Sequence, residues 1–399
     1  MKAFFWISLF TVFYTFIGYG IFLYLLVCLK RLINGRVTAP STDQLPSLTL
    51  VVAAYNEADI LPDKINDTLR LSYPEGKLSI IFVTDGSSDG SEDVVANHPG
   101  IMLMHSPERK GKIHAIHRAM QMVTSEIVVF TDANTFLNPD AMKLIARHYA
   151  DPKVGAVSGE KRVMIDAVSD ATAGEGFYWK YESTLKRWDS ELYSVVGAAG
   201  ELFSVRTRLY EDVEPDTVLD DFMISMKIAS NGYRIVYEPE AYAMEHSSEN
   251  VEEELKRKVR IAAGGIQSII RLKSLLNPLR HPVLTFQYLS HRVLRWTVTP
   301  FLMIGCFAAN VSLVIQRAPE LYHFLLYAQL AFYGAALVGY LLAQRKMKVK
   351  AFFVPYYFCI MNYAVLAGIV RYFSKGQQAA WEKSRRKQVV ANPVFNETS

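Results

Sequence analysis

The chain has 399 residues, of which 51% are hydrophobic, and carries a formal net charge of +4. This length exceeds one small domain, and this composition is too apolar for a protein that is soluble throughout. A nearly neutral chain also lacks the concentrated basic face of a nucleic-acid-binding protein, so we expect no nucleic-acid partner.

The first apolar segment, Ala3–Leu29, is long enough to span a bilayer. It is too long for a signal peptide and no small-residue cleavage site follows it, so we predict that residues 1–36 form a permanent transmembrane anchor. Only Lys2 precedes the segment, whereas three basic residues follow it closely: Lys30, Arg31 and Arg36. The positive-inside rule then places the N-terminus outside the cell and the next domain in the cytosol.

Residues 47–265 have an ordinary globular composition and alternate between two kinds of pattern. Short apolar runs predict strands, and 3.6-residue periodicity between them predicts helices. The strands are expected at 48–53, 78–84, 101–105 and 126–131, and the helices at 57–71, around 94–95 and at 113–122. This alternation indicates an α/β fold with a mostly parallel sheet, in which ligands bind at the carboxyl ends of the strands.

Polar residues follow the first two predicted strands. Asn56 and Glu57 come after the first, and Asp85 opens a turn after the second. A carboxylate at Asp85 can accept hydrogen bonds from the base or ribose of a nucleotide. Lys112 lies in a later polar loop, where its ammonium group can contact phosphate or base. We expect all four residues to bind the ligand.

Asp132 and Asn134 follow the fourth predicted strand, two residues apart. Mg²⁺ and Mn²⁺ take oxygen ligands and commonly bridge phosphates with one or two protein carboxylates. We therefore expect Asp132 and Asn134 to hold Mg²⁺ or Mn²⁺ beside a bound diphosphate.

Two acidic and two basic residues farther along the chain suggest a transfer reaction. Asp220 and Asp221 precede a predicted helix at 222–229. An acceptor hydroxyl loses a proton as it attacks a sugar's anomeric carbon, and a positioned carboxylate can take that proton. One of the pair would be this base and the other would orient the loop, and capping of the helix is compatible with both. Arg257 and Arg260 can neutralise a departing diphosphate.

Residues 266–293 mix apolar and basic side chains and are broken by Pro278 and Pro282. This pattern predicts an amphipathic segment on the cytosolic membrane surface.

The region 294–373 contains three apolar segments, at 296–316, 321–343 and 351–373, and a basic tail occupies 374–399. The first two segments predict a transmembrane hairpin. Two placements of 351–373 remain open: simple spanning, or a re-entrant or interfacial position that keeps the basic residues on both sides of it in the cytosol.

Taken in order, these residues resemble the family-2 glycosyltransferases with a GT-A fold, the group that includes cellulose, chitin, hyaluronan and poly-N-acetylglucosamine synthases. The likeness covers roughly 47–268 and the flanking membrane segments. It rests on five elements: Ala54-Tyr-Asn-Glu57, the turn at Asp85, Arg109-Lys-Gly-Lys112, Asp132-Ala-Asn134 and Leu219-Asp-Asp221. Gly197 to Gly200 also resembles the family's glycine-rich acceptor loop. The resemblance implies that Asp221 is the catalytic base.

The resemblance also implies an activity and a location. The activity is inverting transfer of a sugar from a nucleotide-sugar, first of all a UDP-sugar, to a glycan or lipid-linked acceptor in cell-surface or exopolysaccharide synthesis. The location is the cell membrane, where the chain would span several times, contact lipid and keep its catalytic domain in the cytosol.

Four positions depart from the family's motifs. Thr84 replaces an Asp of the nucleotide turn, and Asn134 replaces the second Asp of the metal site. In the family's Gln-x-x-Arg-Trp motif, Arg257 replaces the Gln and Ile261 replaces the Trp that supports the acceptor in processive synthases, whereas Arg260 keeps its place. Two further hypotheses follow: a single-sugar transferase acting on a lipid carrier, or an inactive regulatory or sugar-nucleotide-sensing subunit. Because so few spans form only a modest channel, export of a polymer would need a second copy of the chain or a translocation partner.

Overall fold

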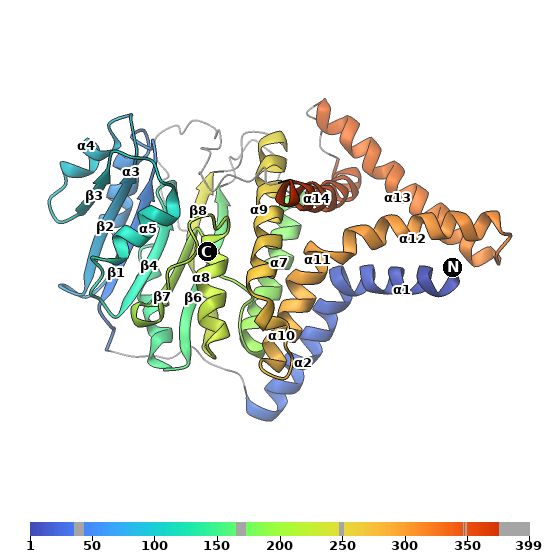
Figure 1. Cartoon of the computed structure of the whole chain (residues 1–399), viewed down its shortest axis with the longest axis horizontal. Coiled ribbons are helices and arrows are strands. Elements are labelled where there is room, and N and C mark those ends of the chain that lie inside the picture. Colours follow the sequence, from blue (N-terminus) through green and yellow to red (C-terminus); the bar gives the residue numbers. More distant parts are fainter. Residues whose placement is uncertain (36–43, 165–172, 247–250, 346, 348, 375–399) are drawn as a thin grey trace.

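A computed structural model describes residues 1–35, 44–164, 173–246, 251–345, 347 and 349–374. Figure 1 shows a sheet domain on one side and a group of long helices projecting from it on the other. Arg36 and, beyond Ser374, the predicted basic tail lie outside the described residues.

The described strands form one sheet in the order β3-β2-β1-β4-β7-β6-β8-β5. The pairs β1–β2, β2–β3, β1–β4 and β6–β8 are parallel, whereas β4–β7, β6–β7 and β5–β8 are antiparallel. The expected α/β fold is confirmed, with a parallel first half and a mixed second half. The strands are β1 (Leu48–Ala54), β2 (Leu78–Asp85), β3 (Met102–Ser106), β4 (Ile127–Asp132), β5 (Thr135–Leu137), β6 (Val154–Met164), β7 (Leu202–Arg206) and β8 (Arg234–His246).

Helices cover both faces of this sheet, which explains why β1 is buried along its whole length. Leu50 and Val52 pack in the core that contains Leu61 and Ile65, while Val51 packs in the core on the opposite face. One face carries α3 (Leu61–Leu69), α4 (Ser91–Ala96) and α6 (Ala141–Ala146), and the other carries α5 (Lys112–Met120), α8 (Asp220–Ser230) and α9 (Val251–Arg271). The strands and helices predicted for the first half of the sheet domain are therefore confirmed in type and order.

The predicted strand ends differ from the observed ones by one residue, and two larger differences concern helices. The helix expected at 57–71 begins only at Leu61, because the preceding residues form a turn that is hydrogen-bonded to the loop after β2. α9 runs without a break across residue 265, and Ile266 and Ser268 on its second half are buried in the domain core. The amphipathic segment expected at 266–293 thus starts within a helix of the sheet domain.

Within the described residues, four helical stretches are long and apolar enough to cross a membrane. The first is continuous from Lys2 to Asn34 and consists of α1 (Lys2–Phe13), a π-helical turn (Tyr14–Gly18) and α2 (Tyr19–Asn34). The others are α12 (Val298–Ile315), α13 (Glu320–Gln344) and α14 (Lys350–Phe373). In Figure 1, α1 and α12 run side by side away from the sheet domain, whereas α14 is seen almost end on.

The helical region and the sheet domain meet along α7 (Ala173–Leu192). Lys30 on α2 donates to the carbonyl oxygens of Glu191 and Leu192 at 2.7 and 2.9 Å, and Arg31 pairs with the Glu191 carboxylate at 2.6 Å. On α7, the buried Asp189 carboxylate accepts hydrogen bonds from Tyr19 and Gln287 and contacts Nδ1 of His291. Basic residues that suggested membrane orientation therefore also fix α2 to the sheet domain.

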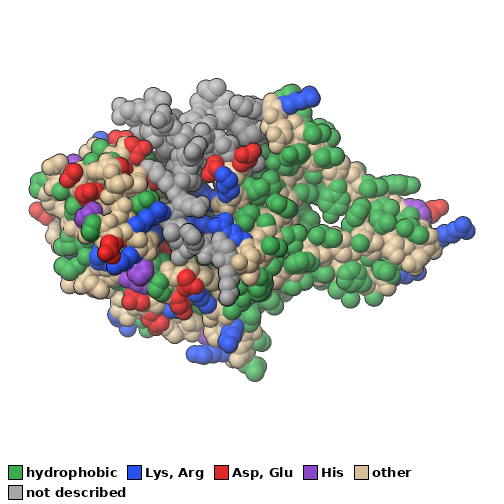
Figure 2. Space-filling model, turned by 45° about the horizontal axis from the view of Figure 1, so that its top comes forward, with side chains coloured by type: hydrophobic (Ala, Val, Ile, Leu, Met, Phe, Trp, Pro, Cys, Tyr) green, Lys and Arg blue, Asp and Glu red, His purple; other side chains and the backbone are tan. Residues whose placement is uncertain are grey.

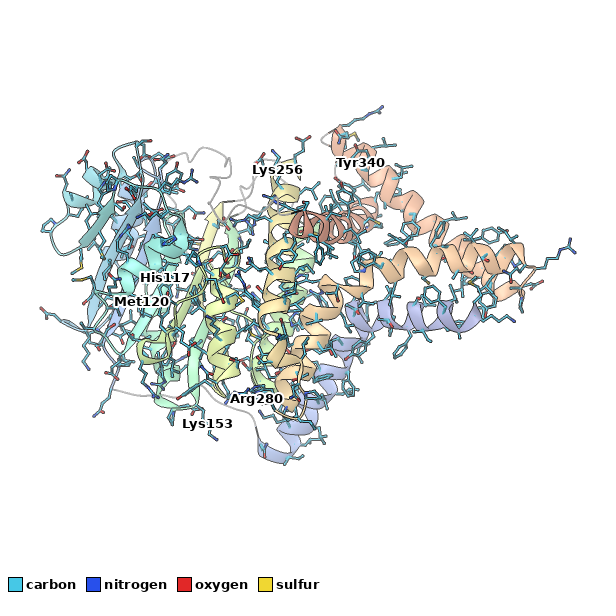
Figure 3. The ribbon with its side chains drawn as sticks, viewed as in Figure 1. His117, Met120, Lys153, Lys256, Arg280 and Tyr340 are labelled. Carbon is cyan, nitrogen blue, oxygen red and sulfur yellow. The ribbon has the colours of Figure 1, made fainter. Side chains whose placement is uncertain are left out.

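The segment between α9 and α12 folds back over this junction. It contains a 3₁₀ turn (Lys273–Leu276), α10 (Pro282–Tyr288), a π-helical turn (Leu289–Val293) and α11 (Leu294–Trp296). Trp296 lies against Gly265 of α9, and its ring centroid is 5.6 Å from that of Phe222 on α8. Figure 3 shows Lys256 at one end of α9 and Arg280 near α10 at the opposite end of the junction.

Candidate active site

Asp85 ends β2 and fixes the loop that precedes α5. Its Oδ2 accepts hydrogen bonds from the backbone N–H groups of Lys110 and Gly111 at 2.9 and 2.6 Å. Its Oδ1 is buried and has no hydrogen-bond donor within the described part of the chain. Gly86 follows with φ +67°, and a Cβ there would lie 2.6 Å from the backbone of Arg109. One oxygen of Asp85 thus shapes the loop, and the other lies 3.7 Å from Nη1 of Arg118.

Asn56 and Glu57 connect the end of β1 to the loop after β2. The Asn56 Oδ1 accepts a hydrogen bond from the backbone N–H of Ser88 at 2.8 Å, and the Glu57 N–H donates to the Ser91 hydroxyl at 3.0 Å. Asn56 itself has φ +52°, a conformation that Asn tolerates better than most residues. These contacts give both residues a role in shaping the loop, and their predicted contact with a ligand remains a prediction.

A small cavity opens beside Asp85. Tyr55, Arg109 and Lys112 are among its lining residues, and the Arg109 guanidinium stands 3.9 Å from the centre of the Tyr55 ring. Thr84 does not reach this cavity, because its hydroxyl points to the other side of the strand and contacts Nδ1 of His105 at 2.9 Å. The substitution at Thr84 therefore removes a carboxylate from the loop without opening a gap in it.

A larger cavity adjoins the first and brings together four charged residues from different elements. It is lined by Lys112 at the start of α5, Asp132 at the end of β4, Asp220 at the start of α8 and Arg260 on α9. The two cavities share Gly111 and Lys112. Four of the residues that the sequence predicted at separate positions therefore meet in one place.

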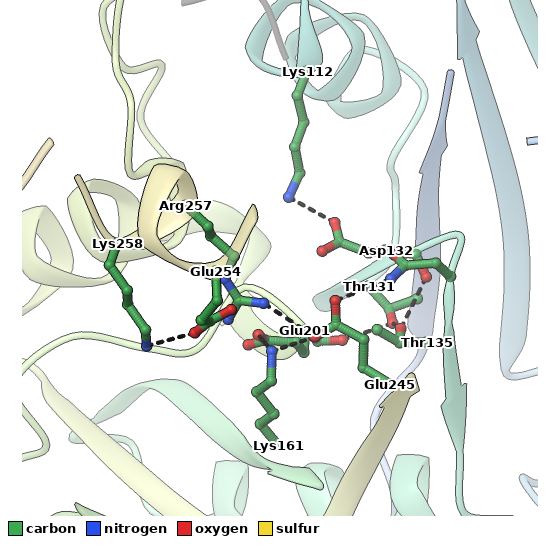
Figure 4. Close-up of polar contacts among 11 residues, drawn as sticks. Lys112, Thr131, Asp132, Thr135, Lys161, Glu201, Glu245, Glu254, Arg257 and Lys258 are labelled. Carbon is green, nitrogen blue, oxygen red and sulfur yellow. Dashed lines mark hydrogen bonds and ion pairs between the residues drawn. The ribbon is translucent and has the colours of Figure 1, made fainter. Parts of the chain in front are cut away.

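Lys112 forms ion pairs with two carboxylates across the larger cavity. Its Nζ lies 2.8 Å from Oδ1 of Asp132 and 3.3 Å from Oδ2 of Asp220. Burial alone would lower the pKa of Lys112, but the carboxylates of Asp132 and Asp220 outweigh it and hold that pKa above its usual range. Lys112 is therefore a permanent cation at this point of the site. Figure 4 shows its side chain reaching from α5 toward Asp132.

Asp221 occupies the first turn of α8, beside the glycine-rich loop at 197–200. A Cβ atom on Gly200 would lie 3.1 Å from Oδ2 of Asp221. Ser225 connects the two segments, since its hydroxyl donates to the Asp221 carbonyl at 2.7 Å and accepts from the Ala198 N–H at 3.0 Å. Burial and the neighbouring Asp220 carboxylate raise the pKa of Asp221 to about 7, although Lys112 opposes the shift. A carboxyl with such a pKa can take up a proton at neutral pH.

The residues around Asp132 and Asn134 offer oxygen ligands to a hard divalent cation. The Asn134 Nδ2 donates to Oε1 of Glu245 at 3.2 Å, while its Oδ1 is buried and meets no hydrogen-bond donor among the described residues. No group of three or more His, Cys, Asp or Glu that could hold a metal occurs in the part of the chain that the structure describes. Mg²⁺ needs only one or two protein ligands when phosphates supply others, so Asp132 and Asn134 fit a metal that is shared with a phosphate ligand.

A buried cluster of charges adjoins this site (Figure 4). Lys161 on β6 is buried and pairs with Glu201 at 2.6 Å and with Glu245 on β8. Arg257 approaches Glu245 at 3.8 Å. The structure thus separates the two predicted arginines, because Arg260 lines the larger cavity and Arg257 pairs with the cluster.

Sequence reasoning missed Lys161, Glu201 and Glu245. Glu201 directly follows the glycine-rich loop, and the other two are charged residues within largely apolar strands, where a charge is costly to bury unless it is paired. A search for charges inside predicted strands would have found Lys161 and Glu245. The pairing itself could be seen only after folding, because 84 residues separate the two positions.

A family model described as glycosyltransferase-like family 2 matches residues 46–264, more than half of the chain. Among curated proteins, poly-beta-1,6-N-acetyl-D-glucosamine synthase of Staphylococcus aureus (strain MSSA476) is 26% identical over 273 residues, which is 66% of either protein. The protein of the same name from Staphylococcus epidermidis (strain ATCC 35984) is 27% identical over 236 residues, or 57% of either protein. The chain thus matches just under two thirds of the first relative's length.

A solved structure of similar architecture covers nearly the whole chain. It is described as the mannosyltransferase PcManGT from Pyrobaculum calidifontis in complex with GDP-Man and Mn²⁺. The TM-score is 0.71 and the identity 24%, and the match covers 93% of this chain and 99% of that one. At this identity the likeness shows a common fold.

Proposed function

The chain belongs to glycosyltransferase family 2, and from this premise we propose that it transfers one sugar at a time from a nucleotide-sugar, first of all a UDP-sugar, to a glycan or lipid-linked acceptor with inversion. The observation that carries the proposal is the meeting of Lys112, Asp132, Asp220 and Arg260 around one cavity, with Asp221 beside it. These residues provide carboxylates, cations and a base with a pKa of about 7. Sugar transfer from a diphosphate donor needs all three kinds of group.

The nucleotide would occupy the small cavity and the diphosphate the larger one. Oδ1 of Asp85, which accepts no hydrogen bond among the described residues and lies 3.7 Å from Nη1 of Arg118, would accept a hydrogen bond from the base. Tyr55 and Arg109 would contact the base from the side. The shared Lys112 lies where the two cavities adjoin, so its ammonium group can reach the phosphates. Asn56 and Glu57 support this arrangement through the loop after β2.

In the reaction, Asp221 would take the proton of the acceptor hydroxyl as the oxygen attacks the anomeric carbon. The bond from that carbon to the diphosphate oxygen breaks on the opposite face, and the electron pair leaves with the nucleoside diphosphate. Arg260 would neutralise the charge that develops on the leaving group. Mg²⁺ or Mn²⁺, held by Asp132 and Asn134, would add positive charge beside the diphosphate when bound. Asp220 would orient Lys112 through their ion pair.

Membrane placement follows from the direction of the helices. In Figure 2 hydrophobic side chains cover the projecting helices, and charged side chains reappear at the far tip, where the turn from α12 to α13 contains Arg317. We therefore place the membrane across α1, α12 and α13, with the sheet domain in the cytosol. α14 lies across that direction in Figure 1 and packs on α9, where Gly368 meets Ala262, so we place it at the cytosolic membrane surface.

This placement of α14 can be tested with single cysteines at Lys350 and Ser374, at its two ends. The three native cysteines, Cys28, Cys306 and Cys359, would first be replaced by alanine. In sealed vesicles, a membrane-impermeant maleimide should label both positions from the cytosolic side. Labelling of the two positions from opposite sides would instead show that α14 spans the membrane.

Two hypotheses concern the number of sugars added to each acceptor: polymer synthesis and a single transfer. Polymer synthesis is favoured by the likeness to poly-beta-1,6-N-acetyl-D-glucosamine synthases. A single transfer to a lipid carrier is favoured by Ile261 in place of the acceptor-supporting Trp. Trp296 does not restore that surface, because it is buried against Phe222 and Gly265. Product length on a gel, from purified protein with its donor and acceptor, would separate the two.

The proposed function is tested with a panel of nucleotide-sugars, including UDP- and GDP-sugars, and a measurement of nucleoside diphosphate released by the purified protein. We expect one donor to support release in the presence of Mn²⁺ or Mg²⁺. The regulatory-subunit alternative predicts binding of a nucleotide-sugar without release. Absence of both binding and release across the panel would reject the proposal.

A further inference from the structure

The Lys112 ammonium group lies between two carboxylates: Asp132 of the expected metal motif, and Asp220, which is next to the proposed base in the chain. Its Nζ contacts Asp132, the only carboxylate of the expected metal motif, at 2.8 Å. The same Nζ contacts Asp220 at 3.3 Å. The side chains are largely buried: Lys112 is 18% exposed, Asp132 19% and Asp220 13%. At this depth an ion pair is screened less by salt and water than one at the surface.

Three carboxylates around this point would repel one another without a cation. The carboxylates of Asp132 and Asp220 lie 2.8 and 3.3 Å from the Lys112 ammonium group, and Asp221 follows Asp220 in the first turn of α8. A divalent cation at Asp132 would satisfy the same negative charge. Lys112 and such a cation would then stand close together, and two like charges at short range in a partly buried site disfavour each other.

The neutral amide of Asn134 makes this competition stronger. A second carboxylate there would let the site hold Lys112 and a divalent cation at once, but an amide adds no negative charge. No group of three or more His, Cys, Asp or Glu that could hold a metal occurs among the described residues. Lys112 and the metal would therefore compete for Asp132.

We propose that Lys112 is an internal counter-ion of the donor-free protein that competes with the divalent cation for Asp132. Binding of the donor relieves the competition, because the diphosphate offers Lys112 another anionic partner. The metal and the donor consequently bind together, and the protein without donor has little affinity for the metal. The step that involves the donor rests on the proposed function, whereas the competition between Lys112 and the metal does not.

The test is a titration with Mn²⁺, followed by electron paramagnetic resonance of the free ion, on the full-length protein without nucleotide. Wild type should bind Mn²⁺ weakly, and Lys112→Met and Lys112→Gln should bind it about tenfold more tightly or better, in the usual range for coupling between two bound species. Lys112→Arg keeps the charge and should stay near wild type. Combining Asp132→Asn with Lys112→Gln should abolish the gain, which assigns it to Asp132.

Lys256→Met is the matched control for loss of one positive charge. Lys256 lies on α9 at 71% exposure and pairs with Glu253, away from both cavities. The Mn²⁺ affinity of the Lys256→Met variant should equal that of wild type. Each variant is first compared with wild type by thermal unfolding, and Lys112→Gln, which retains a polar group, stands in if Lys112→Met does not fold.

Two outcomes would overturn the proposal. One is equal Mn²⁺ affinity in wild type and Lys112→Gln, and the other is tight binding by Lys112→Arg, which would show that the charge is not what competes. Adding UDP to wild type should raise its Mn²⁺ affinity by a similar factor. If UDP has no effect while the Lys112 variants still bind Mn²⁺ tightly, the proposed donor is wrong and the competition stands.

Discussion

Gly200 lies so close to Asp221 that a Cβ atom at position 200 would stand 3.1 Å from Oδ2 of the carboxylate. The glycine-rich loop and the start of α8 are held in this contact by Ser225, which bonds to both. The absence of a side chain at Gly200 therefore sets where the proposed base can sit. This relationship connects the loop that resembles the family's acceptor loop to the proposed proton acceptor.

Gly200→Ala should consequently displace the Asp221 carboxylate by a few tenths of an ångström. We expect kcat to fall on the order of tenfold while the Kd for the nucleotide stays near that of wild type, since small misplacement of a reacting group is costly. Steady-state kinetics and calorimetry measure the two quantities. Gly334→Ala on α13, where an added Cβ meets no described atom within 4 Å, is the control and should leave both unchanged.

Asp221→Asn removes the proposed base and keeps its shape. Transfer should fall by roughly 10²- to 10⁴-fold, whereas binding of the donor nucleotide should remain nearly intact. Because the pKa of Asp221 is about 7, the wild-type rate should rise with pH up to that value and then level off. A parallel loss of binding and turnover in the variant, measured by calorimetry and kinetics, would exclude this role for Asp221.

The same substitution should stabilise the protein at high pH. The carboxyl of an unfolded Asp has a pKa of about 3.9, and folding raises that of Asp221 to about 7. The folded state therefore binds an extra proton between these values, so wild-type stability falls as pH rises through them. Asn does not titrate. Asp221→Asn should thus gain up to about 4 kcal/mol over wild type near pH 8 and nothing near pH 4, and thermal unfolding at both pH values tests this.

Lys161→Met should leave Glu201 and Glu245 as buried carboxylates without their shared partner. Breaking such a buried pair typically costs about 3–5 kcal/mol of unfolding free energy. Burial favours the neutral form of Glu201, but Lys161 and Arg257 outweigh it and hold the pKa of Glu201 well below its usual range. This stabilisation is present above the pKa of an unfolded Glu, about 4.3, and is lost as pH falls below that value, so the difference from wild type should shrink only below about pH 4.

Lys256→Met is the comparison for Lys161→Met, because its ion pair with Glu253 is exposed. The free energy of unfolding should change by less than about 1 kcal/mol. If the two variants unfold alike in denaturant titrations, the cluster around Lys161 is not important for stability.

Removal of divalent cations should stop release of the nucleoside diphosphate. Treatment with a chelator and dialysis is expected to abolish activity, and Mn²⁺ or Mg²⁺ should restore it, because Asp132 and Asn134 bring no positive charge to the diphosphate and the metal that they would hold supplies it. Asp132→Asn should not recover at metal concentrations that restore wild type. Full activity after chelation, checked by metal analysis of the sample, would reject a metal-dependent reaction.

Local patterns in the sequence determined the first half of the fold. Apolar runs of strand length alternate with helical periodicity from Leu48 to Asp132, and each such element needs only its own residues to be recognised. The same patterns put Asp85 and Asp132 at strand ends, where a parallel sheet exposes them together. The apolar lengths of residues 2–34, α12, α13 and α14 were equally clear from the sequence, because length and hydropathy are properties of a continuous segment.

Only the tertiary structure decided how distant charges are shared. Lys112 lies between Asp132 and Asp220, and Arg260 lines the cavity whereas Arg257 lies near Glu245. The buried Lys161 pairs with Glu201 and Glu245. The tertiary structure also laid α14 across the other long helices, on α9. These outcomes depend on packing between elements that lie far apart in the chain. Periodicity shows which face of an element is apolar, but the partner of a charged side chain is fixed only when the elements have met.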